Sequence, residues 1–200
     1  FRVDPAAGQI VDLFAYVQHT WTATWWLELT GGARIDQHNY FGSFVSPRAG
    51  VLLLPSERAR VKVLYGRAFR APTVRELSVL VGLEDDGENC YTAGNPGLSP
   101  ETIDTVEGEI EGDPAPWLTL RVAAFGSRIA DEINVSTRTS PKLGSHYYAN
   151  LGSGEVVGAE AESIVEAGPV EVDLSGSWTR AIDGTTGNVQ FGFPALMGHG

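Results

Sequence analysis

The sequence predicts an all-β protein, an antiparallel up-and-down meander of about eight or nine long strands. Three observations lead to this prediction. Apolar and polar residues alternate with a period of two, and helical periodicity is nearly absent. Short turns and longer polar loops alternate between the strand-like runs. Several runs are longer than about ten residues, whereas strands of globular proteins usually have about five or six.

The strands are placed by their alternation and by the turn residues between them. The segment HTWTATWW (19–26) predicts a tight connection, Gly168-Pro169 a short turn, and the glycines of LGSGEVVG (151–158) a β-bulge. A last strand barely begins after residue 193. The expected strands span Ile10–His19, Leu27–Asp36, Pro47–Leu54, Arg58–Ala68, Thr102–Gly112, Trp117–Val135, Tyr147–Glu166 and Val170–Thr179.

The longest loop lies between residues 70 and 101. Pro72 ends the preceding strand because proline cannot donate to a ladder. A short helix is expected at Thr73–Leu80, with Thr73 as N-cap and Glu76 completing a capping box. Gly82–Pro100 is too polar and too rich in turn formers to belong to a core. Loops of this length are usually functional or disordered.

The two kinds of connection lie at opposite ends of the predicted sheet. Short turns are expected near 21–24, 55–57, 113–116 and 168–169, and longer loops near 36–44, 70–101, 136–146 and 182–193. This asymmetry, the long strands and the single apolar face are typical of an outer-membrane β-barrel. Tryptophans 21, 25, 26 and 117 gather at the short-turn end, where an aromatic girdle would lie. Alternation alone also allows a soluble β-sandwich with one face packed inward.

Composition narrows the classes of partner and site. The net charge of -11 argues against nucleic acid, whose phosphates attract a basic surface. No run of about eighteen apolar residues predicts a transmembrane helix. Cys90 is the single cysteine, so an internal disulfide is excluded. Because the chain begins at Phe1 without a signal peptide, we expect a piece of a longer protein.

Five separated segments resemble the β-barrel of TonB-dependent outer-membrane receptors. In chain order they are FGSFVSPRAG (41–50), YGRAFRAPTVREL (65–77), GNPGLSPETIDTVEGEI (94–110), FGSRIADEI (125–133) and YANLGSGEVVGAEAE (148–162). The residues of three of these segments that carry the resemblance are Phe69, Arg70, Pro72, Glu76, Asn95, Pro96, Pro100, Glu101, Glu107, Asn150, Gly158 and Glu160.

The resemblance implies a fold and a function. The family barrel is the plugged, roughly 22-stranded transporter class, of which residues 1–200 would be an open part without the plug or the final strands. Such receptors take up iron–siderophore chelates, haem or cobalamin. The implied partners are outer-membrane lipid, the small-molecule ligand and the TonB energy-coupling protein, which acts through the plug. No catalytic residue, cofactor or metal is expected, since no serine-nucleophile signature or paired carboxylates are present.

A lumen charge ladder is predicted where the strands at 58–68 and 102–112 pair. Antiparallel pairing would place Arg58, Arg60 and Lys62 opposite Glu111, Glu109 and Glu107, respectively. The ladder either holds the register or contacts a plug or the transport path, and we favour the first interpretation. Arg70 is expected to anchor the loop base through a carboxylate.

Ligand contact is most plausible at the tip of the long loop. The tip carries Glu84, Asp85, Asp86, Glu88, Asn89 and Tyr91. The four carboxylates could also suit a calcium ion, but their spacing matches no EF-hand, which favours a solvated acidic loop. His146 and Tyr147, at the end of another long loop, are further ligand candidates, against the simpler interpretation as an aromatic girdle.

Three functions remain open. The first is an energy-coupled outer-membrane importer, the second another outer-membrane barrel such as a porin or adhesin, and the third a secreted β-sandwich binding module. For the chain alone, we expect an open, twisted sheet whose first and last strands do not pair.

Overall fold

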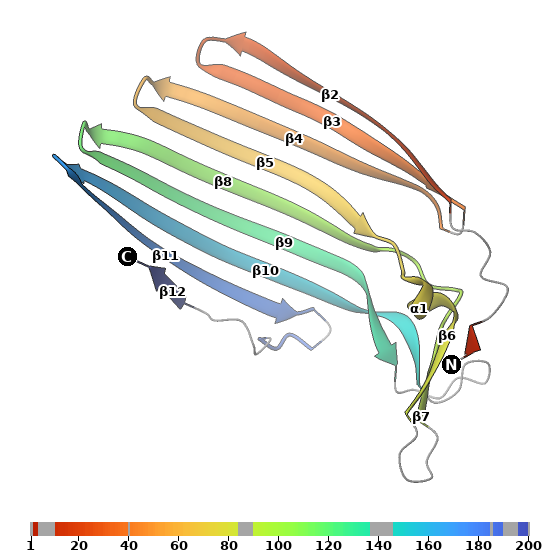
Figure 1. Ribbon diagram of the computed structural model, residues 1–200. Coiled ribbons are helices and arrows are strands. Elements are labelled where there is room, and N and C mark those ends of the chain that lie inside the picture. Colours follow the sequence, from red (N-terminus) through yellow and green to blue (C-terminus); the bar gives the residue numbers. More distant parts are fainter. Residues whose placement is uncertain are drawn as a thin grey trace.

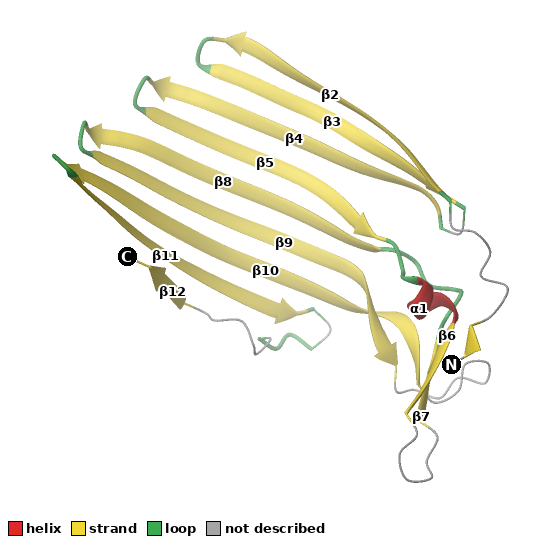
Figure 2. Ribbon diagram, viewed as in Figure 1, coloured by secondary structure: helices red, strands yellow, loops and turns green. Residues whose placement is uncertain are grey.

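The computed structural model describes residues 2–3, 11–39, 41–83, 90–136, 146–184, 186–189 and 196–199. In these residues it forms a single curved antiparallel sheet of long strands, with one short helix at the loop end (Figures 1 and 2). None of the described helices is long and apolar enough to cross a membrane.

Most of the long strands are longer than the predicted ones, and β9 has the predicted length of 19 residues. The elements are β1 (Arg2–Val3), β2 (Asp12–Thr24), β3 (Leu27–His38), β4 (Gly42–Ser56), β5 (Ala59–Arg70), α1 (Val74–Ser78), β6 (Val79–Leu83), β7 (Cys90–Ala93), β8 (Glu101–Ala115), β9 (Leu118–Ser136), β10 (His146–Ala167), β11 (Val170–Asp183) and β12 (Leu196–His199).

The long strands pair with their chain neighbours in the order β2-β3-β4-β5-β8-β9-β10-β11, and β12 follows β11. The short strands β6 and β7 form a side branch with β1. Strand β7 joins the start of β10, at the loop end of the sheet, through a parallel pair. Among the described residues, β2 pairs only with β3, so the first and last long strands stay apart. The prediction of an open sheet is confirmed.

The short turns lie together at one end of the sheet and the long connections at the other (Figure 1). The predicted position of the first short turn was wrong. The connection near 21–24 is strand, and Trp25-Trp26 alone make the turn. The outward-facing series that contains Leu13, Val17 and Trp21 therefore continues to the end of β2.

The two faces of the sheet differ in polarity as the alternation predicts. One face carries exposed apolar side chains along every long strand, and nothing in the described part of the chain covers them. Because no second sheet packs on this face, the β-sandwich interpretation fails. The exposed apolar band includes Leu13, Val17, Trp21, Val63, Val106, Ile110, Leu120, Val122, Val170, Val172, Leu174 and Trp178.

The apolar band crosses the strand register diagonally. One register row joins Trp21 on β2 to Trp178 on β11 through the intervening pairs. On β2 the band runs from Trp21 away from the short turn, to Leu13, whereas on β11 it runs from Trp178 towards the short turn, to Val170. A shift of about 26 Å over about 34 Å of strand spacing corresponds to strands tilted by roughly 40°, as in outer-membrane barrels.

At that tilt, the series from Val170 to Trp178 spans roughly 20 Å along the membrane normal, comparable with the ~25 Å apolar band of known outer-membrane barrels. Trp21 and Trp178 then lie at opposite edges of the band, although one register row joins them. The apolar face therefore has the dimensions and the inclination of a lipid-facing surface.

Candidate functional site

The base of the long loop is organised by Arg70, at the end of β5. Its guanidinium binds Glu101 through two bonds, from Nε at 2.6 Å and from Nη2 at 2.7 Å. It also reaches both oxygens of Glu76, at 3.1 and 3.2 Å. Glu101 accepts a further bond from the backbone N–H of Ile133, at 2.7 Å. One arginine thus ties β5 to β8 and to helix α1, and Glu101 extends the contact to β9.

Helix α1 begins with the predicted capping box. The backbone N–H of Thr73 donates to Glu76 at 2.7 Å, and the N–H of Glu76 donates to the Thr73 hydroxyl at 3.3 Å. Glu76 therefore serves two purposes, since it caps the helix and holds Arg70.

These bonds shift the acidity of the two carboxylates, which lie beyond the apolar band. The Arg70 guanidinium lowers the pKa of Glu101; burial opposes this, and the Ile133 N–H adds to it. Burial pushes the pKa of Glu76 upward, but the bonds from Arg70 and Thr73 outweigh it and leave that pKa below its usual value. Both groups are held as carboxylates.

Two asparagines fasten the loop to the β9–β10 pair. Asn95 donates to the carbonyl oxygen of Tyr148 at 2.9 Å and accepts from the N–H of Gly97 at 2.9 Å. Asn150 accepts from the N–H of Ser99 at 2.9 Å and donates to the carbonyl oxygens of Ser99 and Asp131, at 2.8 and 2.6 Å. The register of β10 shifts beside Asn150, between residues 150 and 154, as the predicted bulge requires.

A small apolar core lies under the same segment. Leu77 of α1, Leu98 of the loop and Ile133 of β9 are buried together, with Phe41 and Tyr148 packed against them. The prediction that Gly82–Pro100 contributes nothing to a core was therefore wrong. Leu98 is only 4% exposed, because the turn at residues 95–98 folds it back onto β9.

On the inner face, ion pairs link four strands in a row. Arg60 of β5 pairs with Glu111 of β8, and Arg121 of β9 bonds the same carboxylate, from Nε at 3.3 Å and Nη2 at 3.2 Å. Arg121 also pairs with Glu162 of β10. Two arginines and two glutamates therefore alternate across β5, β8, β9 and β10.

The predicted charge ladder exists, but its register was wrong by two residues. Lys62 binds Glu109 at 3.1 Å and Arg60 faces Glu111, whereas Glu107 faces Leu64. Arg58 lies outside the strand, in the turn before β5. That turn uses residues 57–58, not 55–57, and so displaces the pairing. A shift of two residues leaves every side chain on its predicted face.

Two inward carboxylates, Glu107 and Glu160, make no hydrogen bond or ion pair with other described residues. They border a hollow on the polar face, which they share with Glu109, Arg121 and Ser177. This hollow lies on the polar face of the sheet, the face that would line a barrel interior.

Gly158 also lies on this inner face, beneath an aromatic ring. A Cβ atom at this position would lie 2.5 Å from Cζ of Phe125 and 2.9 Å from the carbonyl oxygen of Trp178. Glycine is required here because the ring and the neighbouring backbone occupy the space of a side chain.

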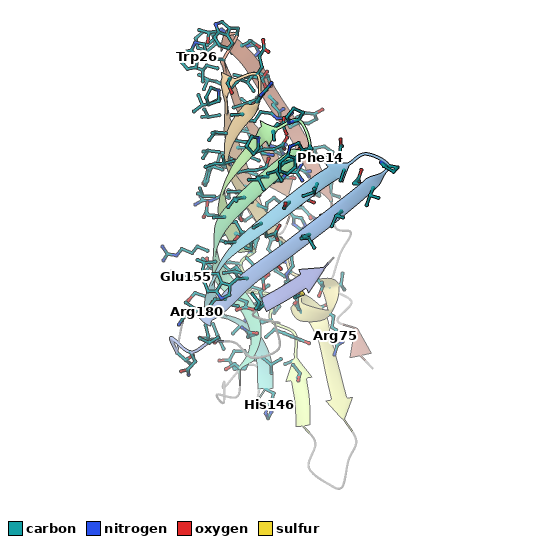
Figure 3. The ribbon with its side chains drawn as sticks, turned by 90° about the vertical axis from the view of Figure 1, so that its left-hand side faces the viewer. Phe14, Trp26, Arg75, His146, Glu155 and Arg180 are labelled. Atoms are coloured by element: carbon teal, nitrogen blue, oxygen red, sulfur yellow. The ribbon has the colours of Figure 1, made fainter. Side chains whose placement is uncertain are left out.

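The predicted ligand-contact residues are only partly visible. Glu84, Asp85, Asp86, Glu88 and Asn89 fall outside the described residues, as does the side chain of Tyr91. His146 and Tyr147 begin β10 and pair with Thr92 and Ala93 of β7. Both residues stand at the loop end of the sheet, where His146 is labelled in Figure 3.

The remaining residues that carry the resemblance lie at the loop base. Phe69 stacks on Phe44 with ring centroids 4.9 Å apart, Pro72 and Pro100 are buried, and Pro96 is exposed in the turn. Within the part of the chain that the structure describes, no group of three or more His, Cys, Asp or Glu side chains is placed to hold a metal ion.

Comparison with known proteins decides the family. Residues 3–197 match the family model of the TonB dependent receptor-like β-barrel. The chain belongs to the TonB-dependent receptor family. As a TonB-dependent receptor barrel, it lies in the outer membrane, with the apolar band facing lipid and the charged face turned inward.

Relatives and solved structures agree with this family. An iron-regulated outer membrane virulence protein of Vibrio cholerae is 30% identical over 176 residues, which are 82% of this chain and 26% of that protein. The vitamin B12 transporter BtuB of Vibrio vulnificus is 27% identical over 72% of this chain and 21% of its own. The chain therefore spans about a quarter of these relatives' length.

Among solved structures, the siderophore receptor PirA from Acinetobacter baumannii aligns with a TM-score of 0.80 at 19% identity, covering 92% of this chain and 30% of PirA. The ferric enterobactin receptor PfeA from Pseudomonas aeruginosa aligns with a TM-score of 0.72 at 23% identity, covering 94% of this chain and 29% of PfeA. These likenesses show the fold.

Sequence reasoning missed two ion-paired sets on the receptor barrel's inner wall. Arg121 and Glu162 were overlooked, although both lie on the polar side of their strands and in line with Glu111 across the sheet. Arg34 binds Asp36 at 2.6 Å, and Asp36 is fully buried. Comparing side-chain faces across neighbouring strands is the signal that would have found the first set.

Proposed function

We propose that the chain is a barrel segment of an energy-coupled outer-membrane importer of a scarce small-molecule ligand. The observation that carries the proposal is the family match, which runs through nearly the whole chain, from residue 3 to residue 197. The names of the relatives suggest the ligand class, since one is a vitamin B12 transporter and others are siderophore receptors. An iron–siderophore chelate, haem or cobalamin is the expected cargo.

Energy coupling requires a plug and the TonB protein, both outside this chain. The inner wall offers such a plug two carboxylates, Glu107 and Glu160, that no described side chain neutralises. Because a plug packed against this wall would take both carboxylates out of water, cationic side chains of the plug would be stabilised beside them. The paired ladder of Arg60, Lys62, Glu109 and Glu111 has no charge to spare, and we assign it to holding the strand register.

Ligand contact is assigned to the loop tip and to the mouth beside it. Arg70, Asn95 and Asn150 tie the loop base to three strands through charge-assisted and backbone bonds. A base of this kind fixes the described segments on either side of the tip, which would lower the entropic cost of ligand contact there. His146 and Tyr147, at the start of β10, are the second candidates, while the base residues themselves are structural.

The proposal is tested by ligand binding to the purified full-length receptor. Ferric siderophores, haem and cobalamin are titrated separately, and ion conductance is measured in planar bilayers. We expect saturable binding of one ligand class and negligible open conductance, because a plug closes the lumen. No saturable binding together with steady conductance would instead support a simple porin, and binding to host surfaces without either would support an adhesin.

A further inference from the structure

The outward face carries a row of charges just above the apolar band. On five neighbouring strands, β5, β8, β9, β10 and β11, the first outward residue beyond the band is charged. Arg67, Asp104, Arg128 and Glu155 share one register row, and Arg180 lies one row lower on β11. Because the strands are tilted, residues of one register row lie at successive levels, and the one-row step on β11 brings Arg180 to nearly the level of Arg128. We call Arg67, Asp104, Arg128, Glu155 and Arg180 the outer charge row.

Two of the five charges in the outer charge row already neutralise each other. Arg67 binds both oxygens of Asp104 at 2.8 Å, and the Tyr65 hydroxyl donates to Asp104 at 2.7 Å. Tyr65 itself is the last residue of the band on β5. This part of the row therefore needs no external partner.

The other three charges of the row have no such partner. Arg128, Glu155 and Arg180 are exposed, and no hydrogen bond or ion pair joins them to one another or to other described residues. Figure 3 shows Glu155 and Arg180 side by side on the same edge of the sheet. Two guanidinium groups thus project outward at the loop-end edge of the band, from β9 and β11, with Glu155 of β10 between them.

The opposite edge of the band has no such charges. On the same five strands, its outward residues at the short-turn end are apolar: Ala59, Gly112, Leu118, Val165 and Val170. A charge row that only marked the water boundary would be expected at both edges. Its restriction to the loop end points to a component of the outer leaflet.

We propose that Arg128 and Arg180 bind the phosphate groups of glycolipid headgroups in the outer leaflet. Arginine suits this partner because its planar fork donates two bonds to a phosphate, and its long side chain reaches from the band edge to the headgroup layer. Glu155, between them, repels the same phosphates and limits the affinity. The inference depends on the outer-membrane location and not on the imported ligand, so it can fail while the importer proposal stands.

The test measures lipid binding to the purified full-length receptor by native mass spectrometry, with diphosphoryl lipid A and its dephosphorylated form as probes. The double variant Arg128→Ala/Arg180→Ala should bind diphosphoryl lipid A roughly 10- to 30-fold more weakly than the wild type. Glu155→Gln should bind it a few-fold more tightly, because a repulsive carboxylate is removed. Arg58→Ala, which removes one arginine at the short-turn end, is the control and should bind like the wild type.

The opposite signs separate recognition from damage. A general loss of structure would weaken binding in the arginine and the glutamine variants alike. Unchanged binding in the double variant, no gain in Glu155→Gln, or equal binding of dephosphorylated lipid A would each overturn the proposal. If the double variant fails to assemble, two measurements still test the proposal. These are the affinity of Glu155→Gln for diphosphoryl lipid A and the difference in wild-type binding between the two forms of lipid A.

Discussion

Gly158 shows most directly how one residue limits the barrel wall. The Phe125 ring occupies the space of its missing side chain, and the Trp178 carbonyl oxygen closes the other side. Gly66 lies on the same inner face, but a Cβ atom there would meet nothing within 4 Å. The two glycines are therefore a matched pair for separating a packing requirement from backbone flexibility.

Gly158→Ala should destabilise the barrel by about 1–3 kcal/mol, because the added methyl group forces the Phe125 ring or the β11 backbone to move. Gly66→Ala should be close to neutral. The urea midpoint of the full-length receptor in lipid vesicles measures both. Equal midpoints for the two variants would show that the ring contact does not constrain the site.

The loop base should be sensitive to acid. Glu76 and Glu101 both have folded-state pKa values below the ordinary 4.5. A lowered pKa means that the contribution of each group is complete above pH 4.5 and is lost as the pH falls through the folded-state value. Limited proteolysis of the long loop should therefore accelerate below about pH 4.5 in the wild type.

Arg70→Lys provides the control for this acid effect. A lysine cannot make the paired bonds to both carboxylates, so the loop should be cut faster at neutral pH and respond less to acid. Arg75→Lys, on the exposed side of α1, should behave like the wild type. A variant at Arg70 with unchanged protection at every pH would contradict the assigned role of the base.

At the scale of the strand, the ion pairs between β5 and β8 carry the register. Glu109 faces Lys62 across the ladder, and Arg60 faces Glu111 one register row closer to the short turn. Glu109→Lys places two ammonium groups opposite each other and should lower the stability of the assembled barrel by about 1 kcal/mol. The difference in electrophoretic mobility between unheated and heated samples measures the folded fraction.

The charge swap Lys62→Glu/Glu109→Lys restores an opposite pair and should recover assembly. Ligand affinity of the assembled Glu109→Lys receptor should equal that of the wild type if the ladder is structural. Normal assembly with weakened ligand affinity would instead place Glu109 on the transport path.

The sequence predicts the faces of the strands better than their register. Alternation assigns Arg60, Lys62 and Glu109 to one face, and the structure agrees. Alternation cannot reveal the two-residue shift in the register of β5 and β8, because a shift of two residues leaves every side chain on the same face. The turn before β5 sets this register. It is formed by residues 57–58 and not by the preceding segment that contains Pro55.

The loop shows the other limit of sequence reasoning. The capping box of Thr73 and Glu76 is local and was predicted. Strands β6 and β7 pair with β1 and with the start of β10, which are remote in the chain, and no local pattern marks them. The burial of Leu98 likewise depends on partners from α1 and β9.

For the whole molecule, the account requires the apolar face to meet lipid and the charged face to meet the lumen. Val122 lies near the middle of the band on β9 and is 54% exposed, while its neighbour Ala123 points inward between Glu109 and Glu160. Val122→Arg should cost about 2–4 kcal/mol, as expected for an arginine at the bilayer midplane. Ala123→Arg should be tolerated, because two carboxylates flank it.

Folding into lipid vesicles, followed by urea unfolding, measures both variants against the wild type. The adjacent positions differ only in the face to which they belong. A larger cost at Ala123 would show that the sheet is oriented the other way, and equal costs would show that the two faces do not differ in lipid contact.

The most direct test of the central claim is uptake by cells that express the full-length receptor. Radiolabelled ferric siderophores, haem and cobalamin are supplied separately, with and without the TonB energy-coupling protein. Saturable accumulation of one ligand class that stops when TonB is removed is the expected result. Accumulation that continues without TonB, or that rises without saturation for every small solute, would contradict it.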